Sequence, residues 1–326
     1  MLETNTNGQD LWENAVRMVP EVSLLSYVNG SEADKVKFVD DLFGGLKEYG
    51  FVILKDHTVD QKKVDKAYDL VHEFFHLPLE TKMKYYNQTG GGQRGYTPFK
   101  VEHAKDNPNP DLKEFWHVGR ELTQESPYFG VYAPNMWPTE VAEFKNVLLD
   151  LWNTMDAASV LLLEAIGKGL DAPEGYFKSL VKDGNSILRT IHYPATKGED
   201  TANSIRAAAH EDINLITMLV GATESGLELL DKDGTWLPVK SKPGQIVVDT
   251  GDMMKRLSNE VLGATTHRVV NPDNDGTARF SMPFFVHPHA NASLKVLPSC
   301  VGEGEKWPDI TANEFLNQRL REIGLM

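Results

Sequence analysis

The sequence predicts a mainly β core of the sandwich or jelly-roll kind, with helices packed outside it. Six short β-prone runs follow one another between residues 186 and 286, and turn signals separate them. The longest helical patterns lie in the residues before this series. Of the 326 residues, 41% are hydrophobic, which is enough for a sizeable core.

The N-terminal part contains three helix candidates and one short strand. Apolar residues recur at helical spacing in each candidate, and glycine or proline stands at its end. The helices are expected at 32–50, 60–78 and 140–170, the strand at 51–55, and a loop-like segment at 90–110.

The β-prone runs begin after Asp183, and no helical pattern interrupts them. The stretch "DKDGTW" is typical of a hairpin turn between two strands. The runs lie at 186–194, 213–220, 227–239, 245–251, 264–270 and 278–286. We therefore predict one functional unit with three regions: a helical and mixed region at 1–182, a β core at 183–300 and a C-terminal helical tail at 301–326.

Charge and composition limit the class of partner. The formal net charge is -14 and the sequence pI is about 5.2. Nucleic acids and anionic membranes attract basic patches, so we expect neither as a partner. The acidic residues are spread along the chain, which indicates a solvated surface.

Cysteine usage and hydropathy predict a cytoplasmic protein. Cys300 is the only cysteine, so no intramolecular disulfide and no CxxC metal site can form. The first 20 residues are polar and lack the apolar core of a signal peptide. No apolar stretch approaches the roughly 20 residues that a membrane-spanning helix needs.

Charged residues stand beside a strongly apolar run in "AAAHEDINLITML". If this stretch is extended, His210 and Asp212 point to the same side, and Glu211 points away. One imidazole and one carboxylate form two-thirds of a two-His-one-carboxylate triad, the arrangement typical of non-haem Fe(II) sites. A solvated strand end is the alternative interpretation of the same residues.

Two downstream segments favour a metal and a bound anion. His267 begins a β-branched run in "SNEVLGATTHRVVNP". Arg279 and Ser281 follow at positions i and i+2 of the otherwise apolar strand "TARFSMPFF", which contains no acidic residue. A buried arginine needs an anion, and a guanidinium binds a carboxylate through two parallel hydrogen bonds. A small dicarboxylate would fit this position.

The segments "HED", "THRVVNP" and "RFSMPFF", in this order, resemble the isopenicillin N synthase-like Fe(II)/2-oxoglutarate-dependent oxygenases. "YGFVILKDH", "FFHLPLETKMKY", "RGYTPF" with "DLKEFWHVG", "ILRTIHYP" and the segment from 226 to 259 extend the resemblance to about nine-tenths of the chain. The sequence departs from the family at His192, where asparagine is common, and at residues 55–58, "KDHT", where "NHG" is common.

The resemblance implies a double-stranded β-helix core, which is a jelly roll. It implies that Fe(II) is held by His210, Asp212 and His267. It also implies that Arg279 and Ser281, helped by Tyr193, bind the distal carboxylate of 2-oxoglutarate. Dioxygen and 2-oxoglutarate would then be cosubstrates. The expected function is hydroxylation, desaturation or cyclisation of a small molecule, with release of succinate and CO2.

Substrate contacts are expected in the loop-rich segment and beside Arg279, because loops on a rigid scaffold often carry specificity. The candidates are Arg94, Tyr96 and Phe285. No catalytic residue is expected beyond the iron ligands.

Three alternatives remain open at this level. The first is an iron oxidase that uses no 2-oxoglutarate, in which Arg279 and Ser281 bind substrate. The second is a non-catalytic jelly roll that binds a small carboxylate. The third is a zinc hydrolase, since two histidines and a carboxylate also suit zinc, although it leaves Arg279 and Ser281 unexplained.

Overall fold

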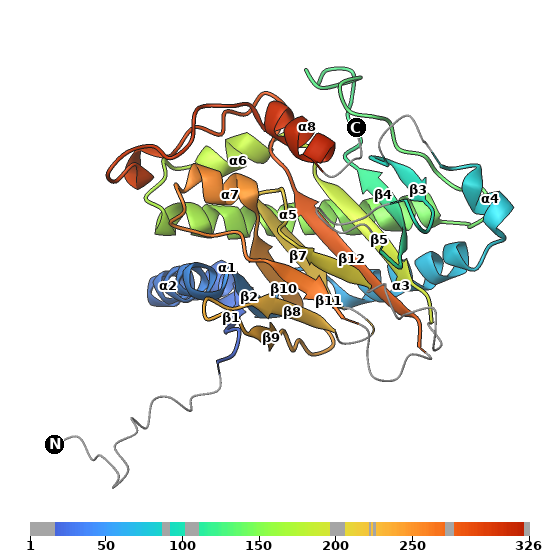
Figure 1. Ribbon diagram of the computed structural model, residues 1–326, viewed down its shortest axis with the longest axis horizontal. Coiled ribbons are helices and arrows are strands. Elements are labelled where there is room, and N and C mark those ends of the chain that lie inside the picture. Colours follow the sequence, from blue (N-terminus) through green and yellow to red (C-terminus); the bar gives the residue numbers. More distant parts are fainter. Residues whose placement is uncertain are drawn as a thin grey trace, which may run out of the picture.

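An eight-stranded sheet forms the centre of the fold (Figure 1). The structure is a computed structural model that describes residues 17–86, 92–101, 111–195, 206–221, 223, 226–270 and 277–322. In spatial order the strands are β1 (Glu21–Ser23), β2 (Phe51–Asp56), β10 (Ile246–Thr250), β7 (Ile216–Val220), β12 (Arg279–Val286), β5 (Ile187–Tyr193), β4 (Glu114–Gly119) and β3 (Gly95–Thr97). Neighbouring strands are antiparallel except for β1 and β2.

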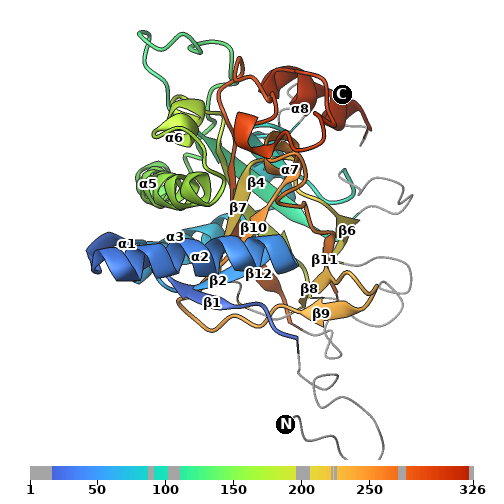
Figure 2. The same ribbon diagram turned by 90° about the vertical axis from the view of Figure 1, so that its left-hand side faces the viewer.

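A smaller sheet packs against one face of the large sheet, and helices cover the other face (Figure 2). The small sheet contains β6 (Ala207–His210), β11 (His267–Val269), β8 (Leu227–Leu230) and β9 (Trp236–Pro238). The helices on that face include α1 (Leu24–Asn29), α2 (Glu32–Tyr49), α3 (Gln61–Phe75) and α5 (Phe144–Gly169). The described residues also form α4 (Leu79–Met83), α6 (Tyr176–Val181), α7 (Asp252–Leu257) and α8 (Ala312–Glu322), of which α7 and α8 lie together at one end of the sheets. The result is a jelly-roll core with flanking helices, which confirms the predicted fold class.

Alternation along the strands separates the two faces of the large sheet. On β2, Val52 and Leu54 join the core under the helices, whereas Phe51 and Ile53 pack with Leu229 of the small sheet. Successive side chains of a strand point to opposite faces, so every strand contributes to both layers. We call the face that looks toward the small sheet the interior face.

The helix predictions for 32–50 and 60–78 are confirmed by α2 and α3. Gly50 ends α2 with a φ of +70°, and a Cβ there would lie 2.0 Å from Oγ1 of Thr265. Only glycine fits this left-handed position without strain. The helix expected at 140–170 begins later, at Phe144.

Three expectations about the elements are wrong. The series of strands is interrupted by α7, whose six residues are too few to show a helical period. The strand expected from residue 213 begins at Ile216, because 213–215 form a bend. The segment 90–110, expected to be a loop, contains β3 within its described residues 92–101.

The sequence regions divided at residue 183 share the large sheet, because β1, β2, β3 and β4 precede this residue and its other four strands follow it. The division therefore stays a proposal about sequence regions. None of the helices in the described residues combines the length and apolar character that crossing a membrane requires.

A buried carboxylate joins four elements under the helices. Glu114 of β4, 1% exposed, accepts hydrogen bonds from Lys82 Nζ (2.8 Å), Tyr96 Oη (2.5 Å) and His192 Nδ1 (2.7 Å). Burial raises the pKa of Glu114, but these hydrogen bonds outweigh it and leave the pKa below its usual value. The group is thus stable as a carboxylate in the core because it has three donors.

We expect Lys82→Met to lower the free energy of unfolding by about 3 kcal/mol or more, because it removes the cation that faces a buried carboxylate. Chemical denaturation measures the change. Lys63→Met is the matched control, since the Lys63–Asp150 pair is exposed and should cost less than about 1 kcal/mol. An equal loss of unfolding free energy in the two variants would show that Lys82 does not stabilise the buried carboxylate of Glu114.

Candidate active site

Strand pairing in the small sheet brings two histidines together. His210 is the last residue of β6 and His267 the first of β11, and the register places them opposite each other. Asp212 lies two residues beyond the end of β6. Its Oδ1 is 3.7 Å from Nε2 of His210 and 3.9 Å from Nε2 of His267. Among the described residues, no other group of three or more His, Cys, Asp or Glu side chains is arranged so that it could hold a metal ion.

Hydrogen bonds to the backbone orient both imidazoles. Nδ1 of His210 lies 2.7 Å from the carbonyl oxygen of Ala208, and Nδ1 of His267 lies 3.1 Å from that of Thr265. A carbonyl oxygen can only accept, so each Nδ1 carries the hydrogen and each Nε2 keeps its lone pair. Both lone pairs are therefore available next to Asp212. A histidine that binds a metal usually donates its other ring N–H to a carbonyl or carboxylate oxygen in this way.

The carboxylate of Asp212 is held from its other side. Thr217 Oγ1 of β7 donates to Oδ2 of Asp212, and Asn214 Nδ2 donates to the same hydroxyl at 2.9 Å. The backbone carbonyl of Asp212 accepts from the amide of Asp252 at the start of α7 (2.7 Å). Asp212 therefore lies beside both histidines, on the same side as His210, as the i, i+2 spacing predicts, although β6 itself ends at His210 and a bend follows at 213–215.

The electrostatics of the cluster favour a cation. Burial, and then the adjacent His267, lower the pKa of His210 to about 4, so its imidazole is neutral at ordinary pH. Burial, and then Asp212, raise the pKa of Asp249 on β10 well above its usual value. The neutral imidazole of His210, the imidazole of His267 and the carboxylate of Asp212 form a donor set that suits a divalent transition metal.

A second group lies on the interior face of β12 and β5. Arg279 is paired in register with Tyr193, and its Cζ lies 4.9 Å from the centre of the tyrosine ring. Arg279 Nη1 is 3.4 Å from Oγ of Ser281. The side chains of Arg279, Ser281 and Tyr193 are 1–3% exposed. Phe280 and Met282, the neighbours of Ser281 on β12, belong to the core under the helices. The structure thus brings Arg279, Ser281 and Tyr193 together.

The three expected substrate contacts lie on different faces. Phe285 is half-buried and, like Arg279, stands at an interior position of β12. Arg94 is 2% exposed and lies against Gly119 of β4, also on the interior face. Tyr96 is fully buried on the opposite face, among Phe74 and Trp116 and bonded to Glu114. The structure therefore does not bring Tyr96 to the His–Asp–His cluster, because its strand position turns it toward the helices.

Sequence reasoning missed a second arginine at the site. Arg189 stands on β5, four residues before Tyr193 and hence on the same face. Its Cζ lies 4.2 Å from the ring centre of Phe115 and 5.2 Å from that of Phe285, and its Nε is 2.6 Å from Nε2 of His117. The strand alternation from Tyr193 could have identified it.

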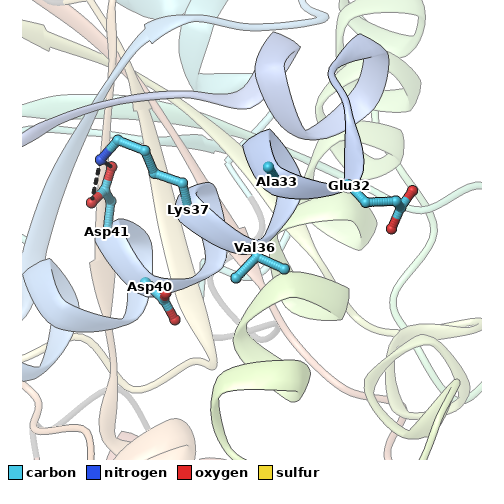
Figure 3. A pocket seen from close by; sticks show the side chains of 6 residues that line it. All are labelled: Glu32, Ala33, Val36, Lys37, Asp40 and Asp41. Carbon is cyan, nitrogen blue, oxygen red and sulfur yellow. Dashed lines mark hydrogen bonds and ion pairs between the residues drawn. The ribbon is translucent and has the colours of Figure 1, made fainter.

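A surface hollow elsewhere does not belong to this site. Figure 3 shows that it is lined by Glu32, Ala33, Val36, Lys37, Asp40 and Asp41 of α2. Lys37 and Asp41 form an exposed ion pair in it (2.8 Å). Because α2 packs on the helix-covered face of the large sheet, the hollow lies on the other side of that sheet from β6 and β11.

The chain resembles one family along most of its length. Residues 19–140 match the family described as "non-haem dioxygenase in morphine synthesis N-terminal", and residues 184–288 match the "2OG-Fe(II) oxygenase superfamily". A 2-oxoglutarate-Fe(II) type oxidoreductase of Emericella nidulans is 31% identical over 87% of this chain and 84% of its own.

Two solved structures have the same architecture. A 2OG-Fe(II) oxygenase family protein from Caulobacter crescentus has a TM-score of 0.84 and 44% identity, and covers 93% of this chain and 98% of its own. A Neurospora crassa protein, solved in complex with alpha-KG and thymine, has a TM-score of 0.84 and 27% identity, and covers 93% and 96%.

We expect the buried His287, two residues beyond Phe285, to make the metal-free protein sensitive to acid. Burial lowers the pKa of His287 to about 4, with Arg94 acting in the same direction and Asp212 opposing it. The unfolded chain takes up this proton near pH 6.5, so the stability due to neutral His287 is complete above that pH. It is lost as the pH falls toward 4, by at most about 3 kcal/mol.

Denaturant unfolding of wild type and His287→Gln between pH 7.5 and 4 checks this expectation. The variant should lose less stability over this interval, because glutamine does not titrate. Parallel pH profiles of the two proteins would show that His287 is not the group responsible.

Proposed function

The chain belongs to the 2OG-Fe(II) oxygenase superfamily. Because members of this superfamily use Fe(II), we propose that His210, Asp212 and His267 bind the iron. The protein is an Fe(II)/2-oxoglutarate-dependent dioxygenase that oxidises a small molecule. The observation that carries the residue assignment is the convergence of two Nε2 lone pairs on one carboxylate, with ligand atoms all within 4.8 Å of one another.

Arg279, Ser281 and Tyr193 are the proposed site for the distal carboxylate of 2-oxoglutarate. The guanidinium supplies a planar fork of donors, the serine hydroxyl adds a donor beside it, and the tyrosine ring covers one side. All three side chains are shielded from water, which strengthens their electrostatic contact with a bound anion. Support comes from the Neurospora crassa protein, which was solved with alpha-KG.

Bound Fe(II), with dioxygen and 2-oxoglutarate, would supply the oxidation, in which the cosubstrate loses CO2 to become succinate and the substrate is hydroxylated, desaturated or cyclised. The protein's own residues position and shield the reactants. Ala208 and Thr265 hold the Nδ1 hydrogens of the histidines, so that the Nε2 lone pairs face Asp212. Thr217 fixes the carboxylate. Ile187, Ile191 and Phe285 give the interior face an apolar surface that excludes water.

Arg94 and Phe285 are the proposed substrate contacts, since both lie on the interior face. A small-molecule substrate agrees with the thymine complex of the Neurospora crassa protein, and the net charge of -14 argues against nucleic acid or an anionic membrane as partner. The single cysteine supports a cytoplasmic location.

The rival interpretations receive less support. An oxidase that uses no 2-oxoglutarate would give Arg279 to the substrate, but the relatives are named as 2-oxoglutarate-dependent enzymes. A zinc hydrolase would leave the buried group of Arg279, Ser281 and Tyr193 without a role. A non-catalytic binder would need no pair of oriented imidazoles beside Asp212.

We expect Asp212→Ala to weaken Fe(II) binding and to abolish succinate formation, because it removes the only anionic donor of the proposed ligand set. Anaerobic Fe(II) titration and a succinate assay measure the two effects. Asp156→Ala is the control, since Asp156 pairs with Arg120 away from the cluster. Normal turnover in Asp212→Ala would sink the assignment.

We expect Arg279→Lys to raise the apparent KM for 2-oxoglutarate about tenfold, equivalent to roughly 1.4 kcal/mol, because lysine keeps the charge but loses the fork. Fe(II) affinity should stay close to wild type. Arg268→Lys is the control, because Arg268 makes a comparable two-nitrogen contact with Glu228 on the small sheet.

An unchanged KM in Arg279→Lys would remove Arg279 from the cosubstrate site. Oxygen uptake by wild type without any 2-oxo acid, coupled to product formation, would favour the oxidase interpretation.

A further inference from the structure

Arg94 is a buried cation that forms no ion pair within the described part of the chain, and the more distant Glu121 only partly opposes the effect of burial on its pKa. Its Nη1 donates to the carbonyl of Gln93 (2.6 Å) and its Nη2 to Oδ1 of Asn185 (2.8 Å), which are both neutral oxygens. Its Nε is buried without a hydrogen-bond partner among the described residues. Burial lowers the pKa of Arg94 to about 10, so the group is still a cation at neutral pH.

The guanidinium of Arg94 takes the place of a side chain on β4. A Cβ built on Gly119 would lie 2.0 Å from Cζ of Arg94 and 2.2 Å from Nε. Gly119 is therefore required for this approach, and Arg94 lies on the face to which a residue at position 119 would point. This observation fixes the face of the sheet that the guanidinium occupies.

On that face, a row of residues paired across neighbouring strands runs from Gly119 to the proposed metal ligand Asp212. Strand register pairs Gly119 with Ile187, Ile187 with Phe285, and Phe285 with Thr217, whose hydroxyl donates to Asp212. Residues paired across neighbouring strands share one face. Arg94 and Asp212 thus stand at opposite ends of a row of four strands, which spans about 14 Å at about 4.8 Å per interstrand spacing.

The two residues of the row between its ends are apolar, and Arg189 lies beside the row with its Cζ 5.2 Å from the ring centre of Phe285. Ile187 is 6% exposed and Phe285 is half-buried, and together they form the floor of the row. His287 lies two residues beyond Phe285 on the same face. It is neutral because of burial, and its Nδ1 has no hydrogen-bond partner among the described residues.

We propose that Arg94 binds a carboxylate of the primary substrate, which is an elongated organic acid. The acid would lie along Ile187 and Phe285 with its charged end at Arg94 and its oxidised carbon near Asp212. This inference rests on the proposed function, which places the metal at Asp212, and it adds the chemical class of the substrate. A buried charged donor that stays unpaired is destabilising, and a bound carboxylate would supply the missing hydrogen bond and charge.

The test uses straight-chain monocarboxylates from butanoate to decanoate and their primary amides as probes. Succinate formation by the Fe(II)-loaded wild type is measured with each probe, relative to the rate without a probe. The acids should stimulate turnover with an optimum chain length, because the row fixes the distance between charge and metal. The amides, which lack the charge, should need at least tenfold higher concentrations.

Two variants separate charge recognition from a structural role. Arg94→Gln should lose the preference for acid over amide, and Arg94→Lys should keep part of it. Arg120→Gln is the matched control, because Arg120 follows Gly119 directly but pairs with Asp156. It should keep the wild-type preference whatever its stability.

The proposal is overturned if amides stimulate as well as acids, if no acid of the series stimulates, or if Arg94→Gln keeps the wild-type preference. Anaerobic binding of 2-oxoglutarate to the Fe(II) protein is measured in parallel, and its absence in wild type would overturn the proposed function instead. In that case, thermal stabilisation of wild type but not of Arg94→Gln by the acids would still support the carboxylate site, and equal stabilisation would reject it.

Discussion

The pairing of β6 with β11 is the constraint on which the rest of the site depends. It sets His267 opposite His210, and Asp212, two residues beyond the end of β6, then lies close to both Nε2 atoms. Because side chains alternate along a strand, a shift of one residue in this register would turn His267 to the other face and dissolve the cluster. The carbonyls of Ala208 and Thr265 add the second condition, since they decide which nitrogen of each ring is free to bind.

The large sheet carries stability on one face and chemistry on the other. Under the helices, Glu114 collects hydrogen bonds from Lys82, Tyr96 and His192, and thereby ties α4, β3, β4 and β5 together. His192 also stacks on Phe280, with ring centres 4.8 Å apart, directly behind the strand segment that presents Arg279 and Ser281. The departure of His192 from the asparagine common in the family is therefore accommodated by the acidic partner at position 114.

The sequence was sufficient for the fold class and for the residues that share a strand. The i, i+2 spacing of Arg279 and Ser281 on an apolar strand predicted their common face, and α2 and α3 followed from their periodicity and their glycine or proline ends. Contacts that depend on how distant segments pack against each other could not be predicted from the sequence. Nothing in "RGYTPF" tells that Tyr96 turns toward the helices while Arg94 fills the place of a side chain at Gly119. Similarly, α7 is too short to give a helical period.

A crystal structure of the protein grown without oxygen, with Fe(II) and 2-oxoglutarate, would locate the iron and the cosubstrate. We expect one iron position in the anomalous map, about 2.0–2.2 Å from Nε2 of His210, Nε2 of His267 and a carboxylate oxygen of Asp212. We also expect the distal carboxylate of 2-oxoglutarate to lie against Arg279 and Ser281. Iron bound at another set of side chains, or 2-oxoglutarate whose distal carboxylate points away from Arg279, would show that the assigned residues are wrong.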